Sequence, residues 1–296
     1  MSELNLINFH QQFPDEQACL DYLESIRWGK DRACPHCGSL KNYKFKSGKL
    51  FKCGDCKKQF TAKVGTIFTD THIPLKKWFM AIYLLTSRKK GTSSVQMSKD
   101  LKITQKSAWF MLQRIRYAMS YGTFDKPLEG VIEVDETYVG GKSDLEHKFS
   151  NKVAVIGMVE KQKDTGRIVT KVTRHADATV AMPFIRANAK QNSEIQTDES
   201  RIYSRLKREY PHKFVTHKNF EYVREDVSTN TIEGAWNHLK LGLKAIYMGV
   251  SPKHLERYCD EFGFRYNTRG LKDGERFEQW FNRINGKHLP YKDLVS

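Results

Sequence analysis

Residues 230–247 read NTIEGAWNHLKLGLKAIY, and this stretch decides the fold because its side chains form two separate stripes. The first stripe is apolar and recurs every three or four residues, at Ile232, Trp236, Leu239 and Leu243. This spacing places the four side chains on one face of an α-helix, as in helices that pack against a sheet. The stretch therefore predicts a helix that covers one face of an α/β domain.

The second stripe is polar and lies one residue further along, at Glu233, Asn237, Lys240 and Lys244. A solvated helix face can have the same composition. Two aspartates upstream favour a functional interpretation, because Asp135 lies in the apolar run VIEVDETYVG and Asp198 ends the run SEIQTD. Two carboxylates at strand ends and a third on a later helix can converge on one pair of divalent cations.

From residue 131 onward, short strand-like runs alternate with longer helix-like ones. Strands are predicted over 131–139, 152–160, 167–173, 194–198 and 213–217, and helices over 179–190, 202–209, 231–247 and 252–267. Three strands followed by alternating helix and strand is the order of an RNase H-like α/β domain of the retroviral integrase superfamily. That fold sets the ends of its first and fourth strands side by side, and these ends carry Asp135 and Asp198. We predict this catalytic domain over 123–270, followed by a polar, mobile tail over 271–296.

Two CxxC pairs precede this domain, Cys34 with Cys37 and Cys53 with Cys56, and the hairpin-like segment YKFKSGKLFK lies between them. Four thiolates at this spacing can surround one Zn²⁺ tetrahedrally. The alternatives are a redox pair of dithiols or an iron–sulfur site, but no thioredoxin-like βαβ pattern surrounds the motif. We predict a zinc ribbon over 31–70 with one structural Zn²⁺, preceded by a helix within residues 1–30.

Residues 71–122 are predicted to be helical. Ser93 or Ser94 can cap a helix that ends at Leu101, and Thr104 can cap the next helix. This pattern indicates a helix-turn-helix, although a plain three-helix bundle would have the same apolar spacing. The preceding ribbon and the charge of the chain favour a DNA-binding function. The basic residues expected on or near the outer faces are Lys102, Lys106, Arg114 and Arg116, of which Lys106 and Arg114 are predicted DNA contacts.

The composition is strongly basic, with 50 Lys+Arg against 34 Asp+Glu and a formal net charge of +16. Nucleic acid is the expected partner, because neutralising phosphates releases condensed counterions. No apolar run approaches the ~20 residues that cross a bilayer, and the N-terminus lacks the apolar core of a signal peptide. We therefore expect a cytoplasmic, nucleoid-associated protein without a membrane partner.

The motifs DETYVGG, TDE and NTIEGAWNHLK, in this order, resemble those of the IS1595 family of insertion-sequence transposases, which have an ISXO2-like DDE domain and an N-terminal zinc ribbon. The resemblance extends from Cys34 to Arg269. It implies that Asp135 bridges two Mg²⁺ or Mn²⁺ ions, that Asp198 holds one of them and that Glu233 holds the other. It also implies a DNA transposase that binds terminal inverted repeats and catalyses strand cleavage and strand transfer.

Lys240 lies two helical turns after Glu233, so its ammonium can reach a DNA phosphate next to the metal ions. Asn237 and Lys244 on the same stripe are further expected DNA contacts. Some relatives have an asparagine as the third metal-site residue, which leaves Asn230 and Asn237 open as alternatives to Glu233. Relatives often have histidine at the position of Ser228, where this chain departs from the family pattern.

Two other functions are compatible with the sequence. A nuclease that does not transpose would cut DNA without joining the ends to target DNA, and a DNA-binding regulator could carry an inactive RNase H-like domain. The presence of all three acidic residues argues against the regulator. Joining two transposon ends to one target requires two active sites, so we expect at least a dimer on DNA.

Overall fold

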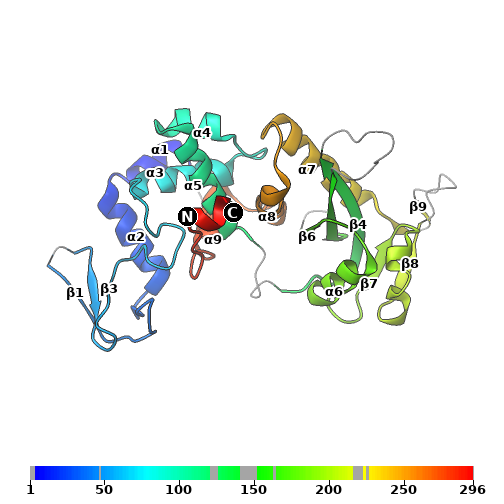
Figure 1. Ribbon diagram of the computed structural model, residues 1–296, viewed down its shortest axis with the longest axis horizontal. Helices are drawn as coiled ribbons and strands as arrows, with labels where there is room; N and C mark the ends of the chain where they lie inside the picture. Colours follow the sequence, from blue (N-terminus) through cyan, green and yellow to red (C-terminus); the bar gives the residue numbers. More distant parts are fainter. Residues whose placement is uncertain are drawn as a thin grey trace. The chain divides into compact units, whose positions relative to one another are not determined.

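The computed structural model describes residues 4–46, 48–120, 126–140, 152–162, 165–215, 223–224 and 227–295. The chain folds into two compact units, one from Met1–Met119 together with Leu271–Ser296 and the other from Ser120–Gly270 (Figure 1). The first unit is therefore built from both ends of the chain and the second from its middle. None of the helices in the described ranges combines the length and the apolar character that crossing a membrane requires.

Five helices of the first unit come from its N-terminal part: α1 (Leu6–Gln12), α2 (Glu16–Trp28), α3 (Leu75–Ser87), α4 (Ser94–Leu101) and α5 (Gln105–Ala118). The predicted helix starts are confirmed by their caps. The Ser93 side chain accepts a hydrogen bond from the backbone N–H of Gln96 at 3.1 Å, and that of Thr104 accepts one from Ser107 at 3.1 Å. Such caps satisfy backbone donors that a helix start leaves unpaired.

Residues 271–296 do not form the mobile tail that the sequence suggested, and this prediction was wrong. They contain α9 (Asp273–Phe281) and α10 (Tyr291–Val295). Phe277, Trp280 and Phe281 are completely buried, and the ring centroids of Phe281 and Phe79 lie 4.7 Å apart. Many charged residues dominate the composition of this segment, but its aromatic residues recur at helical spacing and complete the core of the first unit.

The ribbon is a three-stranded antiparallel sheet in the order β1 (Asn42–Lys44), β2 (Phe51–Cys53), β3 (Gln59–Phe60). The predicted hairpin is confirmed by the pairing of β1 with β2, although position 47 of its turn lies outside the described residues. Phe51 and Phe60 are buried and stack with their centroids 5.5 Å apart, and Trp28 of α2 packs edge-on against Phe51. One face of the ribbon is thus covered by α2.

The second unit contains a five-stranded mixed sheet in the order β6-β5-β4-β7-β8. Strand β5 runs antiparallel to both β4 and β6, whereas β7 is parallel to β4 and β8 is parallel to β7. A short antiparallel pair, β9 with β10, precedes the helix that carries NTIEGAW. The strand bounds are β4 (Val131–Gly140), β5 (Lys152–Glu160), β6 (Ile168–Thr173), β7 (Glu194–Thr197), β8 (His212–Phe214), β9 (Val223–Arg224) and β10 (Val227–Ser228).

Helices cover both faces of this sheet (Figure 1). On one face lie α6 (Ala178–Asn188) and two 3₁₀ helices, η1 (Arg201–Tyr203) and η2 (Leu206–Arg208). The single helix predicted over 202–209 is therefore replaced by these two short turns. On the other face lie α7 (Asn230–Ala245) and α8 (Pro252–Asn267). The apolar stripe of α7 is confirmed, because all four of its residues are buried against the sheet.

Candidate metal centres and active site

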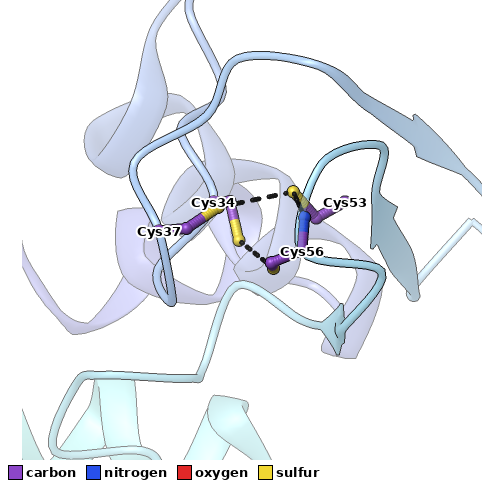
Figure 2. A group of neighbouring side chains, drawn as sticks. All are labelled: Cys34, Cys37, Cys53 and Cys56. Atoms are coloured by element: carbon purple, nitrogen blue, oxygen red, sulfur yellow. Dashed lines mark hydrogen bonds between the residues drawn. The ribbon is translucent and has the colours of Figure 1, made fainter.

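The four ribbon cysteines converge on one point (Figure 2). Their sulfur atoms all lie within 4.8 Å of one another, with Cys34 Sγ 3.8 Å from Cys56 Sγ and Cys37 Sγ 3.6 Å from Cys53 Sγ. A tetrahedral zinc ion with Zn–S bonds of about 2.3 Å separates its sulfurs by roughly 3.8 Å. The four residues therefore fit one Zn²⁺. Within the described residues, no other group of three or more cysteine, histidine or acidic side chains is as close.

Asp135 lies in the middle of β4, on the face that α7 covers. Its carboxylate accepts a hydrogen bond from Trp236 Nε1 at 3.0 Å. Burial, together with the negative charges of Glu136 and Asp198, raises the pKa of Asp135 to about 7. Crowded, buried carboxylates resist ionisation, and a divalent cation relieves that resistance by neutralising them. Asp135 could therefore hold a divalent cation in this environment.

Asp198 follows β7, which pairs in parallel with β4 and so brings Asp198 near Asp135. Its carboxylate accepts a hydrogen bond from the backbone N–H of Ser200 at 3.0 Å. Glu136 lies on the other face of β4, where it accepts a hydrogen bond from Tyr203 Oη at 2.7 Å. Burial and the charge of Asp198 raise the pKa of Glu136. The predicted orientation of Glu136, opposite to Asp135, is confirmed by these partners.

Glu233 lies in the first turn of α7 and is half-buried. Its carboxylate accepts a hydrogen bond from Thr229 Oγ1 at 2.9 Å. The three predicted metal ligands do not form a cluster as tight as that of the four cysteines. Among the described residues, no set of three or more acidic side chains has its oxygens within 4.8 Å of one another, as the four sulfurs are. The structure brings Asp135, Glu136 and Asp198 into electrostatic interaction. Glu233 lies on α7, and Trp236 of the same helix contacts Asp135.

Most side chains predicted to contact DNA are accessible. Lys106 is exposed at the start of α5, and Asn237, Lys240 and Lys244 are exposed along α7. The apolar stripe of α7 faces the sheet, so this polar stripe faces solvent. These four side chains are therefore available to a ligand.

Arg114 is not available, and its predicted role as a DNA contact was wrong. Its side chain is 3% exposed, and its guanidinium donates hydrogen bonds to the backbone oxygens of Leu289 at 2.9 Å and of Ile67 and Thr69 at 2.7 Å. Arg116 is also buried. The outward orientation was assigned without the segment 271–296, and Leu289 of that segment lies against Arg114.

Glu133 is a site residue that the sequence analysis missed. It lies on the same face of β4 as Asp135 and is completely buried. Its carboxylate accepts hydrogen bonds from the backbone N–H of Ile232 at 2.9 Å and from Thr231 Oγ1 at 3.0 Å, and Ser228 Oγ is 3.4 Å away. A negative charge is stabilised at a helix N-terminus, so this contact fixes the start of α7 on β4. The available signal was a charged residue inside an apolar strand.

Gly157 is a second residue that sequence reasoning did not identify. It lies on β5 directly opposite Asp135 of β4. A Cβ atom at this position would lie 2.6 Å from Cζ2 of Trp236 and closer still to its Cη2. Glycine therefore allows the indole to approach the strand and its Nε1 to reach Asp135. Trp236 thus packs the core and also orients an acidic side chain.

Comparisons with known proteins agree with this organisation. Residues 127–267 match the ISXO2-like transposase domain, and residues 14–59 match the transposase zinc-ribbon domain. An uncharacterized protein in transposable element ISH50 of Halobacterium salinarum is 27% identical in an alignment of 278 positions, which covers 86% of this chain and 91% of that protein. An uncharacterized transposase-like protein of Haemophilus influenzae is 28% identical over 107 residues, which are 36% of this chain and 85% of that protein.

Among solved structures, one chain of the simian T-cell lymphotropic virus intasome in complex with PP2A regulatory subunit B56 gamma matches 50% of this chain and 55% of its own length. The sequence identity is 15% and the TM-score is 0.26, which is too low to bear on the fold. The two domain matches and the relative in a transposable element place this protein among the transposases. The chain belongs to the IS1595 family, with the ISXO2-like domain and the zinc ribbon of that family.

Proposed function

We propose that this protein is the transposase of an insertion sequence, which binds the terminal inverted repeats of its element and catalyses DNA cleavage and strand transfer. The observation that carries the proposal is the acidic cluster of Asp135, Glu136 and Asp198 where β4 and β7 run side by side. The cluster lies inside the segment that matches the transposase domain. A group of half-buried, interacting carboxylates in a strongly basic protein is suited to binding divalent cations beside DNA.

We infer that the domain over 123–270 has an RNase H-like fold and that the domain over 71–122 is a helix-turn-helix. The sheet order β6-β5-β4-β7-β8, with an antiparallel half and a parallel half, supports the first assignment. Helices α4 and α5, joined by a turn at Lys102, support the second. In this interpretation the zinc ribbon over 31–70 and the helix-turn-helix bind the terminal repeats.

Asp135, Asp198 and Glu233 would hold two Mg²⁺ or Mn²⁺ ions. When bound, such a pair stabilises the negative charge on the attacking and leaving oxygens of a phosphodiester. The protein orients each carboxylate by a hydrogen bond, from Trp236 to Asp135, from Ser200 to Asp198 and from Thr229 to Glu233. Side chains held in this way lose little freedom when they bind a cation, which favours a preformed site.

Lys240, Asn237 and Lys244 on the exposed side of α7 would position DNA phosphates next to Glu233, and Lys106 would contact DNA from α5. Arg114 has no part in this interface. Two element ends must be joined to one target, so we propose that the protein acts as a homo-oligomer, at least a dimer, on DNA.

The test separates metal binding from phosphate binding on the same helix. Glu233→Gln should abolish Mg²⁺-dependent cleavage of a terminal-repeat substrate while DNA affinity stays nearly unchanged, and Asp135→Asn and Asp198→Asn should behave alike. Lys240→Ala should lower the rate and reduce the salt dependence of binding by about one counterion. Glu233→Gln and Lys240→Ala are a matched pair of variants, because both side chains project from α7.

Each other outcome points to a different function or ligand. Loss of cleavage in Asn230→Ala or Asn237→Ala, with cleavage retained in Glu233→Gln, would assign the third metal position to an asparagine. A protein that cuts terminal-repeat DNA but never joins a 3′-hydroxyl end to target DNA would be a nuclease. Binding with neither cutting nor joining would indicate a regulator.

A further inference from the structure

The ribbon hairpin has one covered face and one open face. Side chains alternate between the faces of a strand, and directly paired residues share a face. Tyr43 pairs with Lys52, Lys52 pairs with Gln59, and the N–H of Phe45 donates to the backbone oxygen of Leu50 at 2.9 Å. These five residues form the open face, which we call the outer ribbon face.

Two aromatic rings are exposed on the outer ribbon face. Tyr43 is 54% exposed and Phe45 is 38% exposed, whereas Phe51 and Phe60 on the covered face are buried. The exposed rings have the strand spacing of two residues, so they lie side by side along one edge of the hairpin. The core of the ribbon is complete without them, since Phe51, Phe60 and Trp28 already form it. Packing of the ribbon core therefore does not account for these two rings.

The same part of the hairpin carries positive charge that no acidic side chain in the described ranges neutralises. Lys46 and Lys49 are exposed beside the turn, and Lys52 is half-exposed on the outer ribbon face. None of the three forms an ion pair with any acidic residue that the structure describes. On the covered face, by contrast, Lys44 lies 3.3 Å from a carboxylate oxygen of Glu24. The unneutralised charge therefore lies on the outer ribbon face at Lys52 and at the turn of the hairpin at Lys46 and Lys49, and it favours a polyanionic ligand.

Rings flanked by lysines are suited to nucleotides whose bases are accessible. Stacking needs the flat face of a base, which neighbouring bases cover in a duplex and leave open in an unpaired segment. Sequence readout in a duplex groove instead uses side chains such as arginine, lysine, asparagine and glutamine, whereas the exposed area of the outer ribbon face includes two aromatic rings, which such readout does not use. Ring stacking together with phosphate attraction thus favours single-stranded DNA over duplex at this surface.

We propose that the outer ribbon face binds unpaired nucleotides of DNA, with bases stacked on Tyr43 and Phe45 and phosphates bound by Lys52 on that face and by Lys46 and Lys49 at the turn. This inference rests on the proposed function, which identifies the polyanion as DNA. It adds that the outer ribbon face prefers single-stranded DNA to duplex DNA. Unpaired nucleotides arise wherever a transposase separates or cuts strands at an element end, so the ribbon would hold such ends.

The experiment uses the full chain with zinc bound and fluorescence anisotropy with two probes, a short oligothymidylate and a random-sequence duplex. Tyr43→Leu and Phe45→Leu remove a ring while keeping apolar bulk, and each should weaken oligothymidylate binding by at least about five-fold. Tyr43→Phe keeps the ring and should restore affinity. Duplex affinity should change by less than about two-fold, because the duplex offers no open base to the ring.

Tyr291→Leu is the matched control, since Tyr291 is 49% exposed in the same unit but lies on α10. It should leave oligothymidylate binding unchanged. Unaltered binding in Tyr43→Leu and Phe45→Leu, or equal losses for both probes, would overturn the proposal. A wild-type protein that binds duplex but not oligothymidylate would also overturn it while leaving the proposed function standing. A protein that binds neither probe would overturn the inference as well, and only a further failure to bind terminal-repeat duplex would refute the proposed function itself.

Discussion

Replacing Gly157 with alanine adds one methyl group to β5 directly against Trp236 and Ile232 of α7. The new Cβ would lie 2.6 Å from Cζ2 of Trp236, closer still to Cη2, and 3.3 Å from Cδ1 of Ile232. Carbon atoms in contact lie about 3.5–4.0 Å apart, so the indole must move by roughly 1 Å. This movement would also break or lengthen the 3.0 Å hydrogen bond from Trp236 to Asp135.

The expected cost of Gly157→Ala is the sum of opposing effects. Overpacking a buried site costs about 1–3 kcal/mol, and a lost hydrogen bond to a carboxylate costs about 1.5–3 kcal/mol. Alanine offsets roughly 0.5–1 kcal/mol because glycine loses more backbone freedom in a strand. We therefore expect the second unit to lose about 2–4 kcal/mol of unfolding free energy. Denaturant titration followed by hydrogen exchange of the β4 and β5 amides would measure this loss.

A double-mutant cycle identifies the indole as the cause. Trp236→Phe removes Cζ2 and Cη2, so the added methyl group meets no atom there. Gly157→Ala should then cost less in the Trp236→Phe background than in the wild type, with a coupling energy of about 1–2 kcal/mol. Strictly additive costs, or a loss below about 0.5 kcal/mol for Gly157→Ala alone, would refute the close approach of Trp236 to β5.

Four further predictions follow from other parts of the molecule. The pKa of Asp135 rises from its ordinary value of 3.8 to about 7, so the metal-free folded state retains a proton that the unfolded chain has lost. Stability should therefore fall as pH increases from about 4 to 7, and Asp135→Asn should flatten this dependence in denaturation at several pH values. Wild-type protein should contain about one zinc per chain by metal analysis, and Cys34→Ser should lose the metal and unfold the ribbon alone; iron or disulfides would contradict the zinc assignment. Arg114→Met should destabilise the first unit by about 3 kcal/mol or more in denaturant titration, whereas Lys106→Ala should lower DNA affinity with little loss of stability. Phe281→Ala should cost the same unit about 3–5 kcal/mol, and a neutral effect would mean that α9 is not part of its core.

Local signals made the elements that position the site predictable. The period of α7 alone predicts which of its residues are buried, and the caps at Ser93 and Thr104 follow from short polar side chains before apolar runs. The cysteine pairs determine the ribbon because four ligands must meet at one ion. Each of these inferences depends on residues close together in the chain.

The missed features depend on contacts between distant segments. From the sequence Arg114 resembles an exposed basic residue on α5, but contacts with Ile67, Thr69 and Leu289 from distant segments bury it. The aromatic residues of α9 become core because α3 lies beside them. Glu133 is a charged residue inside an apolar strand, and its hydrogen-bond donor comes from the start of α7, far along the chain. No local pattern could supply these partners, since chain segments far apart provide them.

Helix α7 makes the geometry of the acidic site depend on the packing of the core. Its first turn donates to Glu133, its Trp236 donates to Asp135, and its own Glu233 is a proposed metal ligand. Strand β4 thus receives three hydrogen bonds from the helix that brings the third carboxylate. Any change that shifts α7 against the sheet must alter the orientation of Asp135 and the position of Glu233 together. Gly157, which carries no catalytic group, should therefore influence cation affinity as strongly as stability, because the absence of its side chain sets the distance between this helix and the sheet.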